Sequence, residues 1–565
     1  MEFSYEDIKL TRLESAAKLI IEFESPWQLH QFISVGNRNK FDQYLYAVDE
    51  IQKSIKSGMT SGYETHGTRA IKTLQLVFRG ILECSISATI SDSSSSPVYS
   101  SSGTSSNGYE LQGSNRTFYH KLSSEQVYYL RNIVRKLNSR GCLGDCTCIY
   151  RISRKSAVDA KLPWLCIWKW TTNDLQNLDR IQFATKIEIW IQAANICYST
   201  IFPRERQYFE QIFDGVSTVT YDNCFLAIVE HVAIELNNFA DAASSIASFQ
   251  NLFAVLDLYE ALLVLLPEIE TMFHSVSSTK ISYGATRIIK NLKILVRKLF
   301  CSFEDTVLNE VSNTPLSEGT IHSLTEYAMN YVTRISLHRK ILADIIVSKP
   351  AKSLGNQEDD QFLDTSDGTP LELHMIWIII SLKINLERKS RAYKDSTSRY
   401  VFITNNVIYI LKTIKACPEL EKMTGEEYPL KLSNYIMQAA QDYFSSIWHR
   451  VLYCLRDDGL NNKFPFYNGI SRKSVKNRFK TFNTTFKEVC QTQSRIFVAD
   501  IHIHHQLHKL ILNTLLPAYE SFLEKYGSHL QGERYKERYI KYSTEDLKNR
   551  MLLTTEANLA QNIFE

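Results

Sequence analysis

The sequence contains few of the residues that interrupt regular structure. Only 20 glycines and 12 prolines occur among its 565 residues, whereas a large β-sheet protein needs turn signals every ~8–12 residues. Helix is therefore favoured over sheet. The chain also lacks a run of about 18 uncharged apolar residues, which a membrane span requires. Its best apolar stretch, 375–382, is too short.

The signatures of disulfide frameworks, secretion and catalysis are missing as well. The 11 cysteines are odd in number and scattered, which is typical of reduced thiols. The first ten residues are acidic and lack the order of a signal peptide. No phosphate-cradling GxxxxGK[ST], dinucleotide-binding GxGxxG, GxSxG elbow or HExxH occurs. We therefore predict a cytoplasmic protein that is not an enzyme and uses no cofactor.

Two groups of side chains resemble metal ligands only in part. Cys142, Cys146 and Cys148 lie close together in the sequence, but no second pair follows at zinc spacing. His504 and His508 are one helical turn apart and have no evident third ligand. We predict no metal site, and we expect the histidines to add pH-dependent charge instead.

The rest of the composition indicates several packed helical units. A hydrophobic content of 44% excludes disorder, and the length is too great for one core. Apolar residues recur at helical spacing, and we predict long amphipathic helices in successive bundles. The periodic segments are 187–201, 249–269, 288–300, 321–347, 371–386, 398–414 and 507–526.

Linkers divide these helices into domains. A Ser-rich low-complexity linker is predicted at 91–116 and an acidic linker at 351–371. An N-terminal helical segment then covers 1–90, and N-terminal and middle bundles cover 117–350. A third bundle covers 372–469, and a basic C-terminal bundle covers 470–565.

Charge is distributed unevenly along the chain. Residues 470–550 carry 15 Lys/Arg and 8 Asp/Glu, although the formal charge of the whole chain is only +3. The remainder is therefore slightly acidic, and an anionic partner is expected at the C-terminal end.

Helical geometry gives part of this basic segment a definite surface. At 100° per residue, Lys473, Lys476, Lys480 and Lys487 fall within about 60° of one another. A neighbouring arc of about 100° is apolar, and it contains Val475, Phe479, Phe482, Phe486, Val489 and Cys490. The residues predict a helix with a buried aromatic face and a lysine stripe, which is either an anion site or a solvated surface.

A second basic group follows at 533–542. It mixes Arg534, Lys536, Arg538 and Lys541 with three tyrosines. Ser543 and Asp546 have the spacing of a capping box, so a last helix is predicted to begin there. Basic side chains beside amphipathic tyrosines suit lipid headgroups. Nucleic acid remains an alternative, although no RNA-binding motif is present.

Several blocks of the sequence resemble the exocyst 70-kDa subunit family, especially its plant members. The most characteristic block is LERKSRAYKDSTSRYVFITNNVIYILKTIK at 386–415. Other blocks agree in the same order along the chain. They lie at 186–213, 256–270, 324–331, 475–489, 515–522 and 538–542, and a weaker agreement reaches back to KFDQYLYAVDEI at 40–51.

The resemblance implies an all-α fold, an elongated rod of consecutive helical bundles. It also implies a non-enzymatic subunit of the exocyst, the complex that tethers secretory vesicles in exocytosis. Such a subunit is peripheral to the plasma membrane and binds phosphatidylinositol 4,5-bisphosphate through its basic C-terminal end. The family's lipid-contacting motifs fall on Arg538 and Lys541 and on Lys476, Arg478 and Lys480, while Lys473 and Lys487 join them by geometry alone.

The resemblance makes the other exocyst subunits the expected partners. It leaves small GTPases or immune proteins open as further partners, and it does not favour nucleic acid. Ile496 stands where the family usually has Trp, and His504 and His508 stand where it usually has Arg. These departures lower the fixed charge at the two histidines and predict weaker or more pH-dependent lipid binding. Only 39 residues precede Lys40, fewer than is typical of the family's coiled-coil end. The alternative is therefore a divergent plant paralogue that acts as an interaction scaffold, for example in immunity.

Overall fold

The structure is a computed structural model of the chain. It describes residues 5–23, 38–57, 62–87, 122–163, 165, 171–216, 221–246, 248–275, 278–311, 320–350, 363, 367–464, 467–493, 501–530 and 536–551. The predicted Ser-rich linker and most of the predicted acidic linker lie outside these residues. Contacts divide the chain into two compact units, Met1–Val296 and Arg297–Glu565. The finer domain boundaries proposed from the sequence remain predictions.

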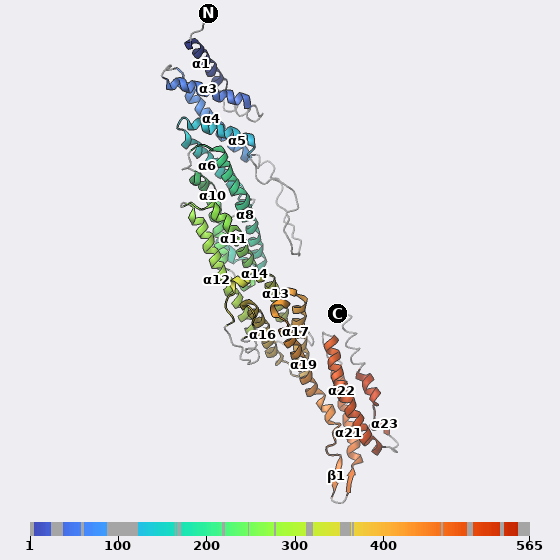
Figure 1. The fold of residues 1–565 in the computed structure, drawn as a ribbon. Coiled ribbons are helices and arrows are strands. Elements are labelled where there is room, and N and C mark those ends of the chain that lie inside the picture. The colour runs from blue at the N-terminus through green and yellow to red at the C-terminus, as the bar shows by residue number, and fades with distance from the viewer. Residues whose placement is uncertain are drawn as a thin grey trace. The chain divides into compact units, whose positions relative to one another are not determined.

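The first unit is helical throughout its described elements (Figure 1). Helices α8 and α11 pack side by side, and α10 packs against α6, α7 and α9. The elements are α1 (Tyr5–Glu22), α3 (Arg38–Lys56), α4 (Glu64–Ser87), α5 (Ser124–Asn138), α6 (Leu143–Asp159), α7 (Thr172–Gln176), α8 (Arg180–Ile196), the π-helical turn η1 (Cys197–Ile201), α9 (Phe202–Ile212), α10 (Tyr221–Ile246), the 3₁₀ turn η3 (Phe249–Asn251) and α11 (Leu252–Met272). Helix α12 (Thr279–Asn309) begins in this unit and ends in the second.

The second unit is built around α16 and α17. Its further elements are α13 (Ser323–Leu337), α14 (Arg339–Ile345), α16 (Pro370–Ser390), α17 (Ser396–Ala416), α18 (Pro418–Thr424), α19 (Glu427–Ile447), α20 (His449–Tyr453), β1 (Asn461–Phe464), β2 (Tyr467–Ile470), α21 (Arg472–Gln493), α22 (Ile501–Tyr526), the 3₁₀ turn η4 (Gly527–Leu530) and α23 (Lys536–Tyr539). A further helical stretch covers 544–551. The apolar run 375–382 is buried on all sides of α16, as expected for a helix at the centre of a core.

Local sequence signals explain where many helices begin. The side chains of four residues each accept a hydrogen bond from the main-chain amide three residues later. The side chain of that later residue in turn accepts a hydrogen bond from the main-chain amide of the first residue. The four capping residues are Ser123, Thr171, Asp179 and Thr369. This reciprocal capping satisfies two amide donors that a helix start would otherwise leave unpaired. The predicted helical fold is confirmed, and the long periodic segments of the sequence are helices.

Three local features differ from a simple succession of helices. A two-stranded antiparallel hairpin pairs Asn461 with Ile470, and its four-residue strands were too short to show a period. The segment 321–347 is two helices rather than one, because the chain turns at His338 (φ −95°, ψ 18°). This turn lets α14 bury Leu342 and Ile345 in the core. The third feature is the π-helical turn η1, which precedes Pro203.

Candidate functional site

The aromatic face of α21 anchors this helix on its neighbours. Phe482 stacks on Tyr519 of α22, with ring centroids 4.9 Å apart, and Phe486 meets Tyr542 edge to face at 5.3 Å. The apolar arc predicted from the sequence is buried throughout its length. Burial of this arc fixes the rotation of α21 about its axis and therefore decides which side chains face solvent.

The lysine stripe lies on the outer surface of α21. Lys473, Lys480 and Lys487 are exposed, and Lys476 is partly exposed. The Lys476 ammonium lies over the ring of Tyr539, 5.4 Å from its centroid. Such a cation–π contact contributes about 0.5–1 kcal/mol at a surface.

The tyrosine-rich turn of α23 lies beside this stripe. The Asn483 side-chain amide of α21 donates a 2.8 Å hydrogen bond to the main-chain oxygen of Tyr539. Asn483 and Lys476 are seven residues apart and therefore share one face of the helix. The structure thus places Tyr539 of the second predicted group against the first, with Arg538 and Lys541 exposed at the turn. Arg534 and the side chain of Lys536 lie outside the described residues.

The other end of the turn is also fixed. The Tyr519 hydroxyl donates to the main-chain oxygen of Tyr542 at 2.6 Å. Ser543 and Asp546 form the predicted reciprocal cap, in which the Asp546 amide donates to the Ser543 hydroxyl at 3.0 Å and the Ser543 amide donates to the carboxylate at 2.8 Å. These hydrogen bonds from Ser543 lower the pKa of Asp546. The capping box predicted from the sequence is confirmed.

Arg550 extends the basic surface, although the sequence did not single it out. Its guanidinium carbon lies 5.8 Å from the centroid of the Tyr542 ring. Ser543 caps the helical stretch 544–551, and Arg550 lies seven residues after Ser543, two helical turns later. This seven-residue spacing is the sequence signal that would have identified Arg550 as a neighbour of the turn.

Arg478 lies apart from the lysine stripe. On α21 it is rotated about 160° from Lys480. Its guanidinium donates to the main-chain oxygens of Tyr453, at 3.2 Å, and Asp458. It also lies 5.6 Å from the centroid of the Tyr453 ring. These contacts tie α21 to the end of α20 and the segment that follows it, so Arg478 has a structural role.

His508 contributes less charge than a solvent-exposed histidine would. His508 is partly buried, and burial lowers its pKa from the usual 6.5. Its charge therefore develops only below that value. Ile496 and the side chain of His504 lie outside the described residues. No group of three or more potential metal ligands occurs among the described His, Cys, Asp and Glu residues.

The block with the strongest resemblance, 386–415, occupies the core of the second unit. Asn406 is fully buried, and its side-chain oxygen accepts hydrogen bonds from the His322 amide at 2.9 Å and the Thr325 hydroxyl at 2.7 Å. Asp395 caps α17 by accepting a 2.8 Å bond from the Ser398 amide. These side chains therefore position helix ends and lie apart from the basic surface.

The end of α12 is held by neighbouring polar residues. Asn385 donates to the main-chain oxygens of Val307, Leu308 and Glu310 at 2.9–3.1 Å. Lys389 forms an ion pair with the Glu310 carboxylate. These bonds satisfy carbonyls that a helix end leaves without intrahelical partners.

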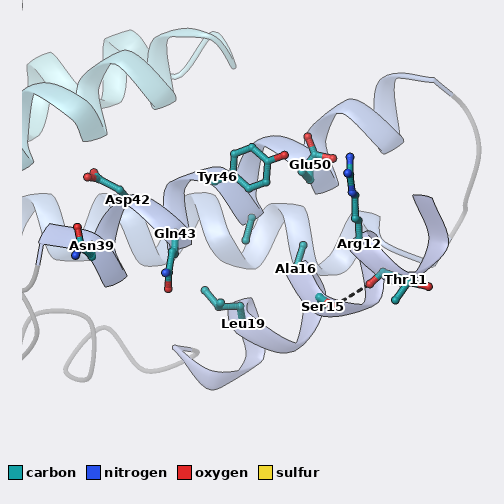
Figure 2. Close-up of a pocket in the computed structure, with 11 residues that line it drawn as sticks. Thr11, Arg12, Ser15, Ala16, Leu19, Asn39, Asp42, Gln43, Tyr46 and Glu50 are labelled. Carbon is teal, nitrogen blue, oxygen red and sulfur yellow. Dashed lines mark hydrogen bonds between the residues drawn. The ribbon is translucent and has the colours of Figure 1, made fainter. Parts of the chain in front are cut away.

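The first unit contains a groove of about 1000 Å³ between α1 and α3. Figure 2 shows Ala16 and Leu19 on α1, with Tyr46 and Glu50 on α3. Its rim combines Arg12 with two carboxylates of α3 and presents no phosphate-binding group of cations. The basic surface belongs to the second unit and is separate from this groove.

No described helix combines the length and apolar character needed to cross a bilayer. Together, the helical bundles and the exposed Lys and Arg side chains of α21 and the α23 turn define an all-α protein with a basic surface in its second unit. The family model for the C-terminal part of the Exo70 exocyst complex subunit matches residues 188–552. The chain belongs to this family of exocyst subunits.

Similar proteins agree with this assignment. Exocyst complex component EXO70A1 of Arabidopsis thaliana is 27% identical over 96% of this chain and 88% of its own length. EXO70B1 of the same plant is 28% identical over 76% of this chain and 66% of its own. The crystal structure of the Saccharomyces cerevisiae exocyst component Exo70p is 14% identical, with a TM-score of 0.56 over 98% of this chain and all of that one. This last similarity concerns the fold.

Proposed function

We propose that the protein binds phosphatidylinositol 4,5-bisphosphate through its basic end and so holds a vesicle-tethering complex at the plasma membrane. The juxtaposition of the lysine stripe with the α23 turn carries this proposal. Arg538 and Lys541 lie at the turn, beside the stripe residue Lys476. A headgroup with several phosphates can contact both groups at once.

The proposed mechanism is electrostatic and involves no catalysis. Each cation near an anionic leaflet contributes about 1 kcal/mol, and exposed charges are screened over about 8 Å at physiological ionic strength. Binding is therefore expected to weaken strongly as salt is added. The partners proposed with it are the other exocyst subunits, because the chain belongs to a family of exocyst subunits.

Liposome flotation tests the lipid site. The full chain is mixed with phosphatidylcholine vesicles that contain or lack the phosphoinositide, and a variant carries Arg538→Ala and Lys541→Ala. Loss of two cations is expected to weaken binding by about 2 kcal/mol, which is roughly thirtyfold.

A matched control removes the same charge elsewhere. Lys290 and Lys298 are exposed on α12, and their double alanine variant should bind as the parent does. Equal binding by the Arg538/Lys541 variant and the parent would refute the site. Equal losses in both variants would reduce the site to a non-specific effect of net charge.

A second candidate function is an interaction scaffold that works outside the assembled exocyst. It is favoured by a weaker basic surface than expected, since Arg478 points to main-chain oxygens away from the lysine stripe and burial lowers the pKa of His508. Affinity purification from plant cells separates the candidates. Recovery of the other exocyst subunits supports the first, and their absence beside other stable partners supports the second.

A further inference from the structure

The first unit carries an accessible groove at the junction of η1, α9 and α11. Its volume is about 480 Å³, and its walls include Ser199, Pro203, Pro267 and Glu268. The Ser199 hydroxyl donates to the Glu268 carboxylate at 3.2 Å and so joins the two walls. This groove is separate from the basic surface and from the groove between α1 and α3.

Prolines alter the main chain on both walls. Pro203 has no N–H to give to the Ser199 oxygen four residues earlier, and Pro267 has none for the Leu263 oxygen. Before Pro203 the main chain forms the π-helical turn η1, in which the Phe202 amide donates to the Cys197 main-chain oxygen. Such turns are frequent at functional sites. The two prolines thus remove the α-helical donors of the Ser199 and Leu263 main-chain oxygens.

Three exposed aliphatic side chains lie on the helices that lead into the groove. Val264 is 69% exposed, Ile196 is 43% exposed and Leu263 is 39% exposed. Helix α8 contacts η3, at the start of α11, and the Ser199–Glu268 hydrogen bond joins the residues just after α8 to the last turns of α11, so the two helices run in the same direction. Ile196 and Val264 each lie one helical turn before the bonded pair of Ser199 and Glu268 and therefore share its face.

The charge on this surface has one dominant sign. Helix α11 contains four carboxylates and no Lys or Arg, and Glu260 and Glu268 are exposed on it. On the opposite wall Arg206 lies 3.7 Å from the Glu210 carboxylate, in an i,i+4 ion pair. An apolar strip with an acidic rim is complementary to an apolar surface flanked by cations.

We propose that this groove and the aliphatic strip of Ile196, Leu263 and Val264 bind an amphipathic helical segment of another protein, one that carries Lys or Arg beside its apolar face. The apolar face covers Val264 and Ile196, and the cations meet Glu260 and Glu268. This is the helix-in-groove mode of recognition, in which anchors at i, i+3/i+4 and i+7 fill the apolar strip.

A designed peptide tests the chemistry directly. The probe is a fluorescent amphipathic helix of Leu and Lys, and the control peptide has Glu in place of Lys. Fluorescence anisotropy with the full chain should show binding of the Leu/Lys peptide only. Val264→Asp and Glu268→Lys should each weaken it at least tenfold, whereas Ile152→Asp, at a 60% exposed residue of α6, should not. Circular dichroism checks that all variants fold.

Crosslinking identifies the natural occupant. A benzoylphenylalanine at position 264 in plant cells should crosslink to a Lys- or Arg-bearing helical segment of another protein. Crosslinks only to a second copy of this chain, or only to an acidic segment, would overturn the proposal. So would unchanged peptide binding in the Val264→Asp and Glu268→Lys variants.

Discussion

Arg478 and Lys480 lie two residues apart on α21, yet the structure gives them opposite roles. In Arg478→Met the main-chain oxygens of Tyr453 and Asp458 lose a charged donor. Hydrogen bonds to charged groups contribute about 1.5–3 kcal/mol. Water can reach this partly exposed site and replace part of the lost hydrogen-bond energy, so we expect the free energy of unfolding to fall by about 2 kcal/mol. Urea denaturation measures this fall, and the slope of unfolding free energy against urea concentration should not change.

Lys480→Met should show the reverse pattern. Lys480 is exposed on the lysine stripe, so its replacement should change stability by less than about 0.5 kcal/mol. Its binding to phosphoinositide vesicles should fall about fivefold, the equivalent of ~1 kcal/mol. Arg478→Met, once shown to be folded, should keep nearly full binding. The reasoning fails if Arg478→Met abolishes vesicle binding without loss of stability while Lys480→Met binds normally.

Three further predictions concern buried or capped polar groups. Asn406→Leu should destabilise the fold by about 2–3 kcal/mol in urea, because two donors lose a buried acceptor; an unchanged midpoint would contradict this. Glu205→Leu should cost about 3–5 kcal/mol, since it leaves Arg154 buried without its bidentate partner, and adding Arg154→Met should recover most of the loss. The lowered pKa of Asp546 means that its cap contributes fully above the ordinary value of 3.8 and is lost as pH falls through the lower folded value. Amide exchange at Ser543 should report that loss, and Asp546→Asn, which keeps a side-chain acceptor but does not titrate, should remove the pH dependence.

Periodic burial was the most predictable feature of the molecule. The apolar arc of α21 recurs at helical spacing, and burying that arc leaves the lysines only one side to occupy. The cap at Ser543 was equally readable, because three residues of spacing suffice to define it. Both predictions depended on contacts within a few residues of the sequence.

Features that depend on distant partners were not readable. Arg478 entered the predicted site through a sequence motif, although its helical angle already separated it from Lys480. Its acceptors lie 20 and 25 residues away along the chain. The contact between Lys476 and Tyr539 spans 63 positions, and nothing local indicates it. The π-helical turn also combines a local proline with the packing of two helices.

The attachment of the α23 turn has a thermodynamic consequence. Because Asn483 and Tyr519 already hold its main chain, the turn does not have to fold when an anion arrives. Little conformational entropy is then lost and little apolar surface is newly covered. Association with a membrane should therefore show a heat-capacity change close to zero. A large negative value would mean that this end of the chain inserts or reorganises.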